Sequence, residues 1–375
     1  MAVSSRTMGR HRDYSRLFIF LGLLAGIVAV APIVAAVMGI GSSVTIPKTA
    51  FASAPAGEYA VITRSEGAAD VVAVAWLNNP GAITEIARVP RVEGFPSTGA
   101  VSPDGKFVAL TSVEGGTASN PVASIIVVSL ESGVITRVAT DAQPGEAPVW
   151  SPDSSAVTFA RDVSRAESAG VFSIARVGRD GEDESTVQEF RSVFGVYPVG
   201  NDVSGRVVTA VLDGKGSWLY RPGLDPVAIS TNLTRDWELS PDGRTVAFIE
   251  VTTVAGVDYR ARTVSLDGSA AAAQALEADV SALGTAWNPA TSAPAFGLEP
   301  VGADGVTVQA LSAEGPGASG FDVPLQYSAS GDGLAVTHWS GRSFQESGTP
   351  ELQLISAAGR SSFEGYTRFL GWSVR

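Results

Sequence analysis

The sequence contains no cysteine and only two histidines, His11 and His338. The missing cysteines exclude disulfides, thiol nucleophiles and zinc–thiolate sites, and two histidines are too few for zinc sites built on several imidazoles. There is also no G-x-S-x-G nucleophile elbow and no Walker phosphate loop. His338, in the segment LAVTHW, is expected to be a packing residue near a strand end. The sequence therefore predicts a non-catalytic protein without a cofactor or a metal site.

Charged residues are missing from residues 17–40, a run of 24 residues that is long enough to cross a bilayer as a helix. Four arginines and one aspartate precede the run, so the positive-inside rule places the N-terminus in the cytoplasm. We expect a cytoplasmic tip over 1–16, a transmembrane helix over 17–40, a flexible linker over 41–57 and an extracytoplasmic domain over 58–375. The predicted location is the cell membrane, with a single span.

A cleaved signal peptide is the alternative interpretation of the same segment. Small-residue cleavage motifs occur at 50–52 and 52–54. The uncharged run is longer than the h-region of a signal peptide, which is about 7–15 residues, and the first motif lies about ten residues beyond it. We therefore favour an uncleaved anchor.

Basic residues are scarce, because the formal net charge is −12. Without the cytoplasmic tip, 22 basic and 37 acidic residues remain, a net charge of −15. Such a surface repels nucleic acid and anionic lipid headgroups. The composition therefore excludes nucleic acid and leaves an envelope protein or a glycan as the expected partner.

What the sequence does contain is a repeat. A turn recurs at intervals of 38 to 51 residues. Its copies begin at Ser102 (SPDG), Ser151 (SPDS), Asp202 (DVSG), Ser240 (SPDG), Asn288 (NPAT) and Ser330 (SGDG). Short apolar runs rich in β-branched residues follow each copy, and a second glycine turn separates the later runs. Four short strands in a unit of about 45 residues are typical of a β-propeller blade.

The two ends of this region complement each other. Residues 58–90 form a unit without a first strand, whereas residues 366–374 form a first strand without a unit. Joining them closes the ring and removes exposed sheet edges. We predict an all-β fold, a seven-bladed β-propeller closed by the C-terminal strand, with six or eight blades as alternatives because three turns are degenerate.

The repeated turn and the tryptophans have structural interpretations. Ser, Pro and Gly suit the first, second and fourth positions of a type I turn, in which the glycine adopts a positive φ. The seven tryptophans fall about once in each unit. We expect them to pack between blades rather than to bind carbohydrate.

The stretches SPDGKFVAL, WSPDSSAVTFA and LSPDGRTVAFIE resemble the repeats of TolB-like propellers. A similar WD-like repeat occurs in the propellers of prolyl-oligopeptidase-type proteases. The resemblance covers residues 57–375 and implies the fold rather than the function. The chain lacks the N-terminal domain of TolB and has no room for a hydrolase domain, so the functions of neither family transfer.

An acidic segment, GRDGEDES (178–185), contains the oxygen ligands that Ca²⁺ prefers. Its spacing does not match an EF-hand, and its place in the repeat is that of a hairpin turn. A solvated acidic turn is favoured over a calcium site.

Propellers commonly bind ligands with the loops that enter the innermost strands. The candidate loops are 91–98, 141–148, 191–198, 231–237 and 364–369. They combine aromatic residues with arginines, a mixture that suits a protein or glycan contact. The candidate binding residues are Phe95, Arg191, Phe194, Tyr197, Arg235, Asp236, Tyr366 and Arg368. Ordinary rim side chains are the structural alternative for the whole set.

The resulting hypothesis is a non-catalytic protein- or glycan-binding module of a bacterial cell envelope, anchored in the membrane. The alternative is a lyase or glycan-acting enzyme with carboxylates, Arg and Tyr over the central channel. Convergent buried carboxylates beside Arg or Tyr would favour the enzyme, and an exposed aromatic and basic patch would favour binding. A transmembrane sensor is least favoured, because the cytoplasmic tip is only 16 residues long.

Overall fold

A computed structural model describes residues 51–163, 170–253, 258–269, 272–273, 281–299 and 320–375. The chain divides into two compact units, Met1–Ser42 and Ser43–Arg375, and every described residue belongs to the second. The predicted cytoplasmic tip, transmembrane helix and first part of the linker lie outside the described residues. Among the residues that are described, no helix is long and apolar enough to span a bilayer.

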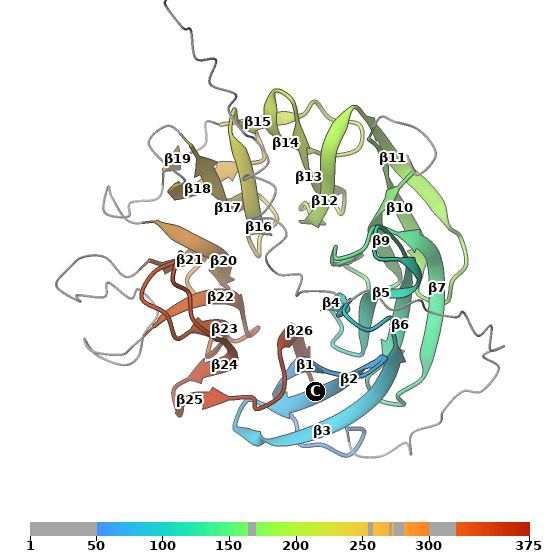
Figure 1. Ribbon diagram of the computed structural model, residues 1–375, viewed down its shortest axis with the longest axis vertical. Coiled ribbons are helices and arrows are strands. Elements are labelled where there is room, and N and C mark those ends of the chain that lie inside the picture. The colour runs from blue at the N-terminus through green and yellow to red at the C-terminus, as the bar shows by residue number, and fades with distance from the viewer. Residues whose placement is uncertain (1–50, 164–169, 254–257, 270–271, 274–280, 300–319) are drawn as a thin grey trace, which may run out of the picture. The chain divides into compact units, whose positions relative to one another are not determined.

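The second unit is a ring of antiparallel sheets, each with its first strand innermost (Figure 1). Blade 1 consists of β26 (Arg368–Val374), β1 (Glu58–Glu66), β2 (Ala69–Trp76) and β3 (Asn79–Pro90). Blade 2 consists of β4 (Thr98–Val101), β5 (Phe107–Thr117), β6 (Asn120–Ser129) and β7 (Ile135–Ala142). Blade 3 consists of β8 (Val149–Trp150), β9 (Ala156–Asp162), β10 (Val171–Gly178) and β11 (Ser185–Arg191).

The later blades repeat this order. Blade 4 consists of β12 (Val193–Asn201), β13 (Val207–Asp213), β14 (Gly216–Tyr220) and β15 (Val227–Ser230). Blade 5 consists of β16 (Leu233–Leu239), β17 (Thr245–Thr252), β18 (Asp258–Ser265) and β19 (Ala272–Ala273). Blade 6 consists of β22 (Phe321–Tyr327), β23 (Gly333–Trp339), β24 (Pro350–Ser356) and β25 (Gly359–Ser362).

The blade count differs from the prediction of seven. The described residues form six four-stranded blades, and a sheet of two strands, β20 (Ala282–Asn288) and β21 (Ala293–Leu298), stands between blades 5 and 6 in the chain. One predicted strand of this unit, 306–312, lies outside the described residues. The alternation of 318–323 would also suit an outermost strand, but Phe321–Tyr327 is the innermost strand of blade 6. Its apolar alternation fits either position, so the pattern alone does not assign it.

The ring closes as predicted. Strand β26 pairs with β1 and completes blade 1, with Glu58 opposite Val374 and Thr63 opposite Arg368. Backbone hydrogen bonds join Gly57 and Arg375 in both directions at 2.9 Å. The two ends of the propeller sequence thus share one sheet.

The repeated turn has the predicted geometry. In the first copy, the Gly105 amide donates to the Ser102 carbonyl at 2.8 Å, and Gly105 has a φ of 70°. The buried Ser102 hydroxyl donates to Asp104 and accepts the Phe107 amide at 3.0 Å, so serine and aspartate fix the turn. In the last copy the prediction was wrong by two residues. The turn begins at Ser328 rather than Ser330, because the Gly331 amide donates to the Ser328 carbonyl.

Tryptophans link neighbouring blades at the ring's inner wall. The indole nitrogen of Trp150 donates to the Ala100 carbonyl at 2.9 Å, and that of Trp287 donates to the Glu238 carbonyl at 3.0 Å. Trp372 makes the same kind of bond to Gln326 at 3.3 Å. Each acceptor lies on the innermost strand of the preceding sheet. Each of these tryptophans therefore contributes packing and one hydrogen bond to the contact between neighbouring sheets.

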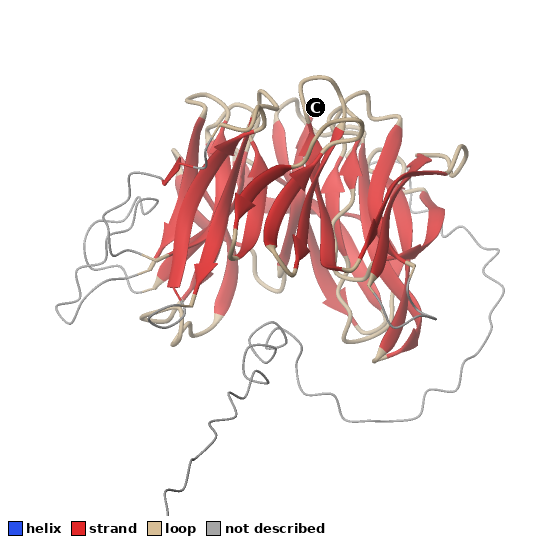
Figure 2. Ribbon diagram, turned by 90° about the horizontal axis from the view of Figure 1, so that it is seen from above, coloured by secondary structure: helices blue, strands red, loops and turns tan. Residues whose placement is uncertain are grey.

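The ring has two faces, which Figure 2 shows from the side. We call "turn face" the face that carries the repeated turns, the hairpins between third and fourth strands, and the C-terminus. We call "entry face" the opposite one, where the chain enters each innermost strand and where second and third strands are joined.

The end of the predicted linker is bound to the ring. Phe51 is buried and packs edge-on against Tyr59, with ring centroids 5.0 Å apart. The Tyr59 hydroxyl donates to the Pro55 carbonyl at 2.7 Å, and the guanidinium of Arg375 lies over the Phe51 ring. Residues 51–57 therefore belong to the propeller domain and are not a free linker.

Candidate functional site

The eight candidate binding residues fall into distinct environments, and several lie on strands rather than on loops. The chain passes from β11 to β12 through the single residue Ser192, so Phe194 and Tyr197 belong to β12. Arg235 and Asp236 likewise belong to β16. The loop prediction for 191–198 and 231–237 was wrong because both segments pair with the second strand of their blade despite bulges.

Four candidates are held within the ring. Phe95 packs against the apolar core shared by blades 2 and 3. Tyr366 is buried in the core of blades 6 and 1, and its hydroxyl accepts a hydrogen bond from Arg64. Arg368 begins β26 near the buried ion pair Asp70–Arg91, and desolvation lowers the pKa of Arg368.

Asp236 is the fourth of these. It adopts a φ of 53°, and its carboxylate accepts the Gly284 amide at 2.8 Å. Its backbone carbonyl accepts the Thr285 hydroxyl at 2.6 Å. Both partners lie on β20, so Asp236 fastens two neighbouring sheets together.

The remaining candidates lie on three consecutive blades: Arg191 ends β11 of blade 3, Phe194 and Tyr197 belong to β12 of blade 4, and Arg235 belongs to β16 of blade 5. Phe194, the second residue of β12, is 69% exposed. Arg191 and Arg235 are exposed, and each pairs with one neighbouring carboxylate, Glu189 and Asp236 respectively. Leu233, which sequence analysis did not select, is 38% exposed at the start of β16.

We call Arg191, Phe194, Leu233 and Arg235 the entry-face patch. Phe194 and Leu233 begin the innermost strands of adjacent blades, and β12 packs against β16. The patch combines exposed apolar side chains with two guanidinium groups on rigid strands. An exposed aromatic and basic surface of this kind is typical of a protein contact.

Tyr197 lies on β12 below the patch. Its ring stacks on Trp237 with centroids 4.8 Å apart, and burial together with the nearby Glu146 raises the pKa of Tyr197 to about 12. Glu146 precedes β8, and burial raises the pKa of its carboxyl to about 7. Burial also raises the pKa of Glu238, on β16, well above its ordinary value. These carboxyls were missed because a lone glutamate in a loop or strand carries no sequence signal.

His338 has the expected structural role. Its Nδ1 lies 2.8 Å from Oδ1 of the buried Asp322, its cross-strand neighbour. Arg360 donates to both oxygens of the same carboxylate, at 2.9 and 2.7 Å. The three side chains form a polar network inside blade 6.

The acidic segment 178–185 is a hairpin turn between β10 and β11. The Gly178 amide donates to the Glu182 carbonyl, and Glu184 pairs with Arg161 at 2.6 Å. No group of three or more His, Asp or Glu side chains suited to a metal ion occurs within the described ranges.

Comparison with known proteins gives the fold. No protein-family model and no curated relative matches the sequence. TolB from Acinetobacter baumannii matches with a TM-score of 0.51 at 13% identity, over 85% of this chain and 67% of that chain. Prolyl oligopeptidase B from Galerina marginata matches with a TM-score of 0.54 at 13% identity, over 84% of this chain and 50% of that chain.

The chain therefore spans about half the length of the oligopeptidase. The β-propeller domain of the trilobed protease from Pyrococcus furiosus has a TM-score of 0.48 at 12% identity, over 82% of this chain and 96% of that chain. Identities this low show the fold alone. The predicted resemblance is confirmed at that level: the described residues form an all-β propeller, and TolB is among its structural neighbours.

Proposed function

We propose that this protein is a membrane-anchored, extracytoplasmic β-propeller of a bacterial cell envelope that docks a protein partner on its entry face without catalysing a reaction. The observation that supports the proposal most directly is the exposure of Phe194, 69%, on the second residue of an innermost strand. Exposed phenylalanine is costly in solution unless a partner covers it, since burial of a Phe side chain stabilises by about 1.5–3 kcal/mol.

The patch has the chemistry of a protein contact. The patch contains the arginines Arg191 and Arg235 besides its apolar side chains, and arginine with aromatic residues is enriched at interface centres. Glu189, the carboxylate partner of Arg191, is 44% exposed, so a partner protein can compete for that guanidinium group, whereas Asp236, the partner of Arg235, is only 22% exposed. The uncharged run at 17–40 and the arginines before it support the anchored topology.

An enzyme is the second candidate, and one observation favours it. Glu146 has a pKa of about 7 and lies near the Tyr197 hydroxyl, an arrangement suited to proton transfer at neutral pH. The Glu146→Gln variant separates the two functions. A glycan-lyase or glycan-hydrolase activity of the full chain that disappears in this variant would replace the binding proposal.

Photo-crosslinking tests the docking face. A benzophenone amino acid is placed at Phe194 in the full chain in its native membrane, and at Val134 as a matched control. Val134 is 54% exposed and lies in a turn-face hairpin. We expect a discrete crosslinked protein from position 194 only, and its loss when Arg191 and Arg235 are both changed to Glu. The same product from both positions, or a glycan in place of a protein, would contradict the proposal.

A further inference from the structure

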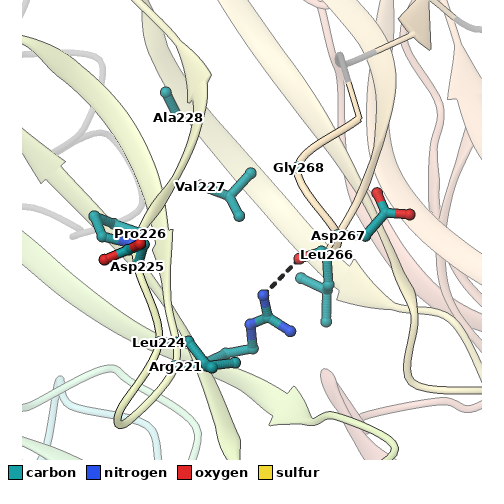
Figure 3. A pocket seen from close by; sticks show the side chains of 9 residues that line it. All are labelled: Arg221, Leu224, Asp225, Pro226, Val227, Ala228, Leu266, Asp267 and Gly268. Atoms are coloured by element: carbon teal, nitrogen blue, oxygen red, sulfur yellow. Dashed lines mark hydrogen bonds between the residues drawn. The ribbon is translucent and has the colours of Figure 1, made fainter.

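A second surface feature lies on the turn face, away from the entry-face patch. It is a cavity of 470 Å³ between two hairpins, one joining β14 to β15 in blade 4 and the other joining β18 to β19 in blade 5 (Figure 3). Its lining residues are Arg221, Leu224, Asp225, Pro226, Val227, Ala228, Leu266, Asp267 and Gly268. Two separate blades therefore build the cavity.

Apolar side chains make up much of its wall. Leu224 is 42% exposed, and Val227 and Leu266 lie on opposite sides, one from each hairpin (Figure 3). Exposed leucine in a concave site provides apolar area that a ligand can bury. The cavity can therefore hold an aliphatic chain.

The cation in the cavity is already engaged. Arg221 reaches across from blade 4 and donates a hydrogen bond to the Leu266 carbonyl of blade 5 (Figure 3). Its other terminal nitrogen is 3.8 Å from the buried carboxylate of Asp202. The guanidinium group thus joins the two blades and lies close to a buried charge of opposite sign.

The cavity lining has more carboxylate groups, Asp225 and Asp267, than cationic groups, Arg221 alone. Hydrogen bonds from Ser269 and Ser265, with a contribution from Arg221, lower the pKa of Asp267, so this side chain is ionised at neutral pH. Asp225 is exposed on the opposite hairpin, and among the described residues nothing donates a hydrogen bond or forms an ion pair to its carboxylate. A free carboxylate beside an apolar wall is complementary to a cation carried on an aliphatic stem.

We propose that this cavity binds a lysine side chain of an extended segment of a protein partner, with the ammonium group at Asp225 and the aliphatic stem against Leu224 and Val227. The cavity volume also admits an apolar residue next to the lysine. This site is separate from the entry-face patch, so the protein has one docking surface on each face.

The test uses a short amidated peptide, Ala-Leu-Lys-Leu-Ala, and the same peptide with norleucine in place of lysine. Binding to the full chain in detergent is followed by fluorescence anisotropy. We expect the lysine peptide to bind more tightly than the norleucine peptide, and its affinity to fall about fivefold between low and high salt.

Variants locate the site. Asp225→Asn is expected to weaken binding of the lysine peptide about fivefold, and Leu224→Asp to weaken binding of both peptides. Glu131→Gln is the matched control, because Glu131 is an exposed carboxylate in the equivalent hairpin of blade 2. Because all three positions are exposed, unchanged thermal unfolding will verify folding. Phe194→Asp should leave peptide affinity unchanged, which keeps this result independent of the entry-face patch.

Three outcomes would overturn the proposal. The first is equal affinity for the two peptides, which would make the site purely apolar. The second is an equal loss in Asp225→Asn and Glu131→Gln, which would reduce the effect to the general negative charge of the surface. The third is no binding of either peptide at millimolar concentration.

Discussion

The carboxylate of Asp236 accepts a hydrogen bond of 2.8 Å from the backbone amide of Gly284, which lies on the innermost strand of the next sheet. Both residues have a positive φ, 53° for Asp236 and 67° for Gly284. The hydrogen bond therefore joins two strand residues whose backbone departs from the extended conformation. The pairing ties blade 5 to the two-stranded sheet.

This relationship predicts the effect of changing Asp236. Asp236→Ala removes the acceptor and places alanine at a positive φ, so the free energy of unfolding should fall by about 1–3 kcal/mol. Asp236→Asn keeps an acceptor oxygen and tolerates this backbone conformation, so its loss should stay below about 1 kcal/mol. Urea unfolding of the two variants measures the difference. Equal losses in the two variants would show that the hydrogen bond from the Gly284 amide to the side chain of residue 236 does not stabilise the fold.

The indole bond of Trp150 gives a second prediction. Trp150→Phe keeps most of the buried ring but leaves the Ala100 carbonyl without its donor, and should cost about 1–2 kcal/mol. Trp150→Ala also opens a cavity between blades 2 and 3 and should cost about 3–5 kcal/mol. Thermal unfolding should show the wild type as most stable, Trp150→Phe as intermediate and Trp150→Ala as least stable. If Trp150→Phe is as stable as the wild type, Trp150 contributes packing alone.

Buried and exposed ion pairs in blade 1 should differ sharply. Asp70 and Arg91 are 1% and 4% exposed, with nitrogen and oxygen 2.7 Å apart. Asp70→Ala leaves the guanidinium buried without its partner and should cost about 3–5 kcal/mol. Glu66, which pairs with Arg64 and Arg88 near the surface, is the matched control, and Glu66→Ala should cost much less than Asp70→Ala because solvent screens these exposed pairs. Comparable losses from the two changes would refute this assignment.

The pKa of Glu146 predicts a pH dependence of stability. This pKa is about 7 in the folded protein, above the ordinary glutamate value of 4.5, so the folded state binds a proton more tightly than the unfolded state. Wild-type stability should therefore decrease as the pH rises from about 4.5 to about 7, by at most about 3 kcal/mol from this group. Glu238 acts in the same direction.

Glu146→Gln should flatten this dependence and stabilise the protein at pH 8 relative to the wild type. Urea unfolding at pH 5 and at pH 8 is the measurement. Glu131→Gln, the same substitution at an exposed position in a turn-face hairpin, is the control. A wild-type stability that rises over this range, with no effect of Glu146→Gln, would contradict the assignment.

The repeated turns and apolar runs predicted the propeller architecture because the same local interactions form each blade. Ser102 and Gly105 specify their turn through contacts within five residues, and ring closure followed from one missing and one surplus strand. The two-stranded sheet and the Ser328 turn were not predicted, because strands such as Phe321–Tyr327 fit more than one place in a degenerate repeat.

The site was harder to predict than the fold. Arg191, Phe194 and Arg235 are exposed on strands of blades 3, 4 and 5, whereas Tyr366 and Asp236 serve the packing of the ring. Sequence position does not distinguish these cases, since an aromatic or an aspartate near a blade junction suits both roles. The raised pKa of Glu146 arises from burial by residues distant in the chain, which no local pattern contains.

The packing of Phe51 beneath Arg375 holds the first described residues against the ring. Residues 51–57 lie at the turn face, beside the C-terminus. Phe51 and Arg375 therefore lie on the face that also carries the cavity between the hairpins of blades 4 and 5, whereas Phe194 lies on the opposite face.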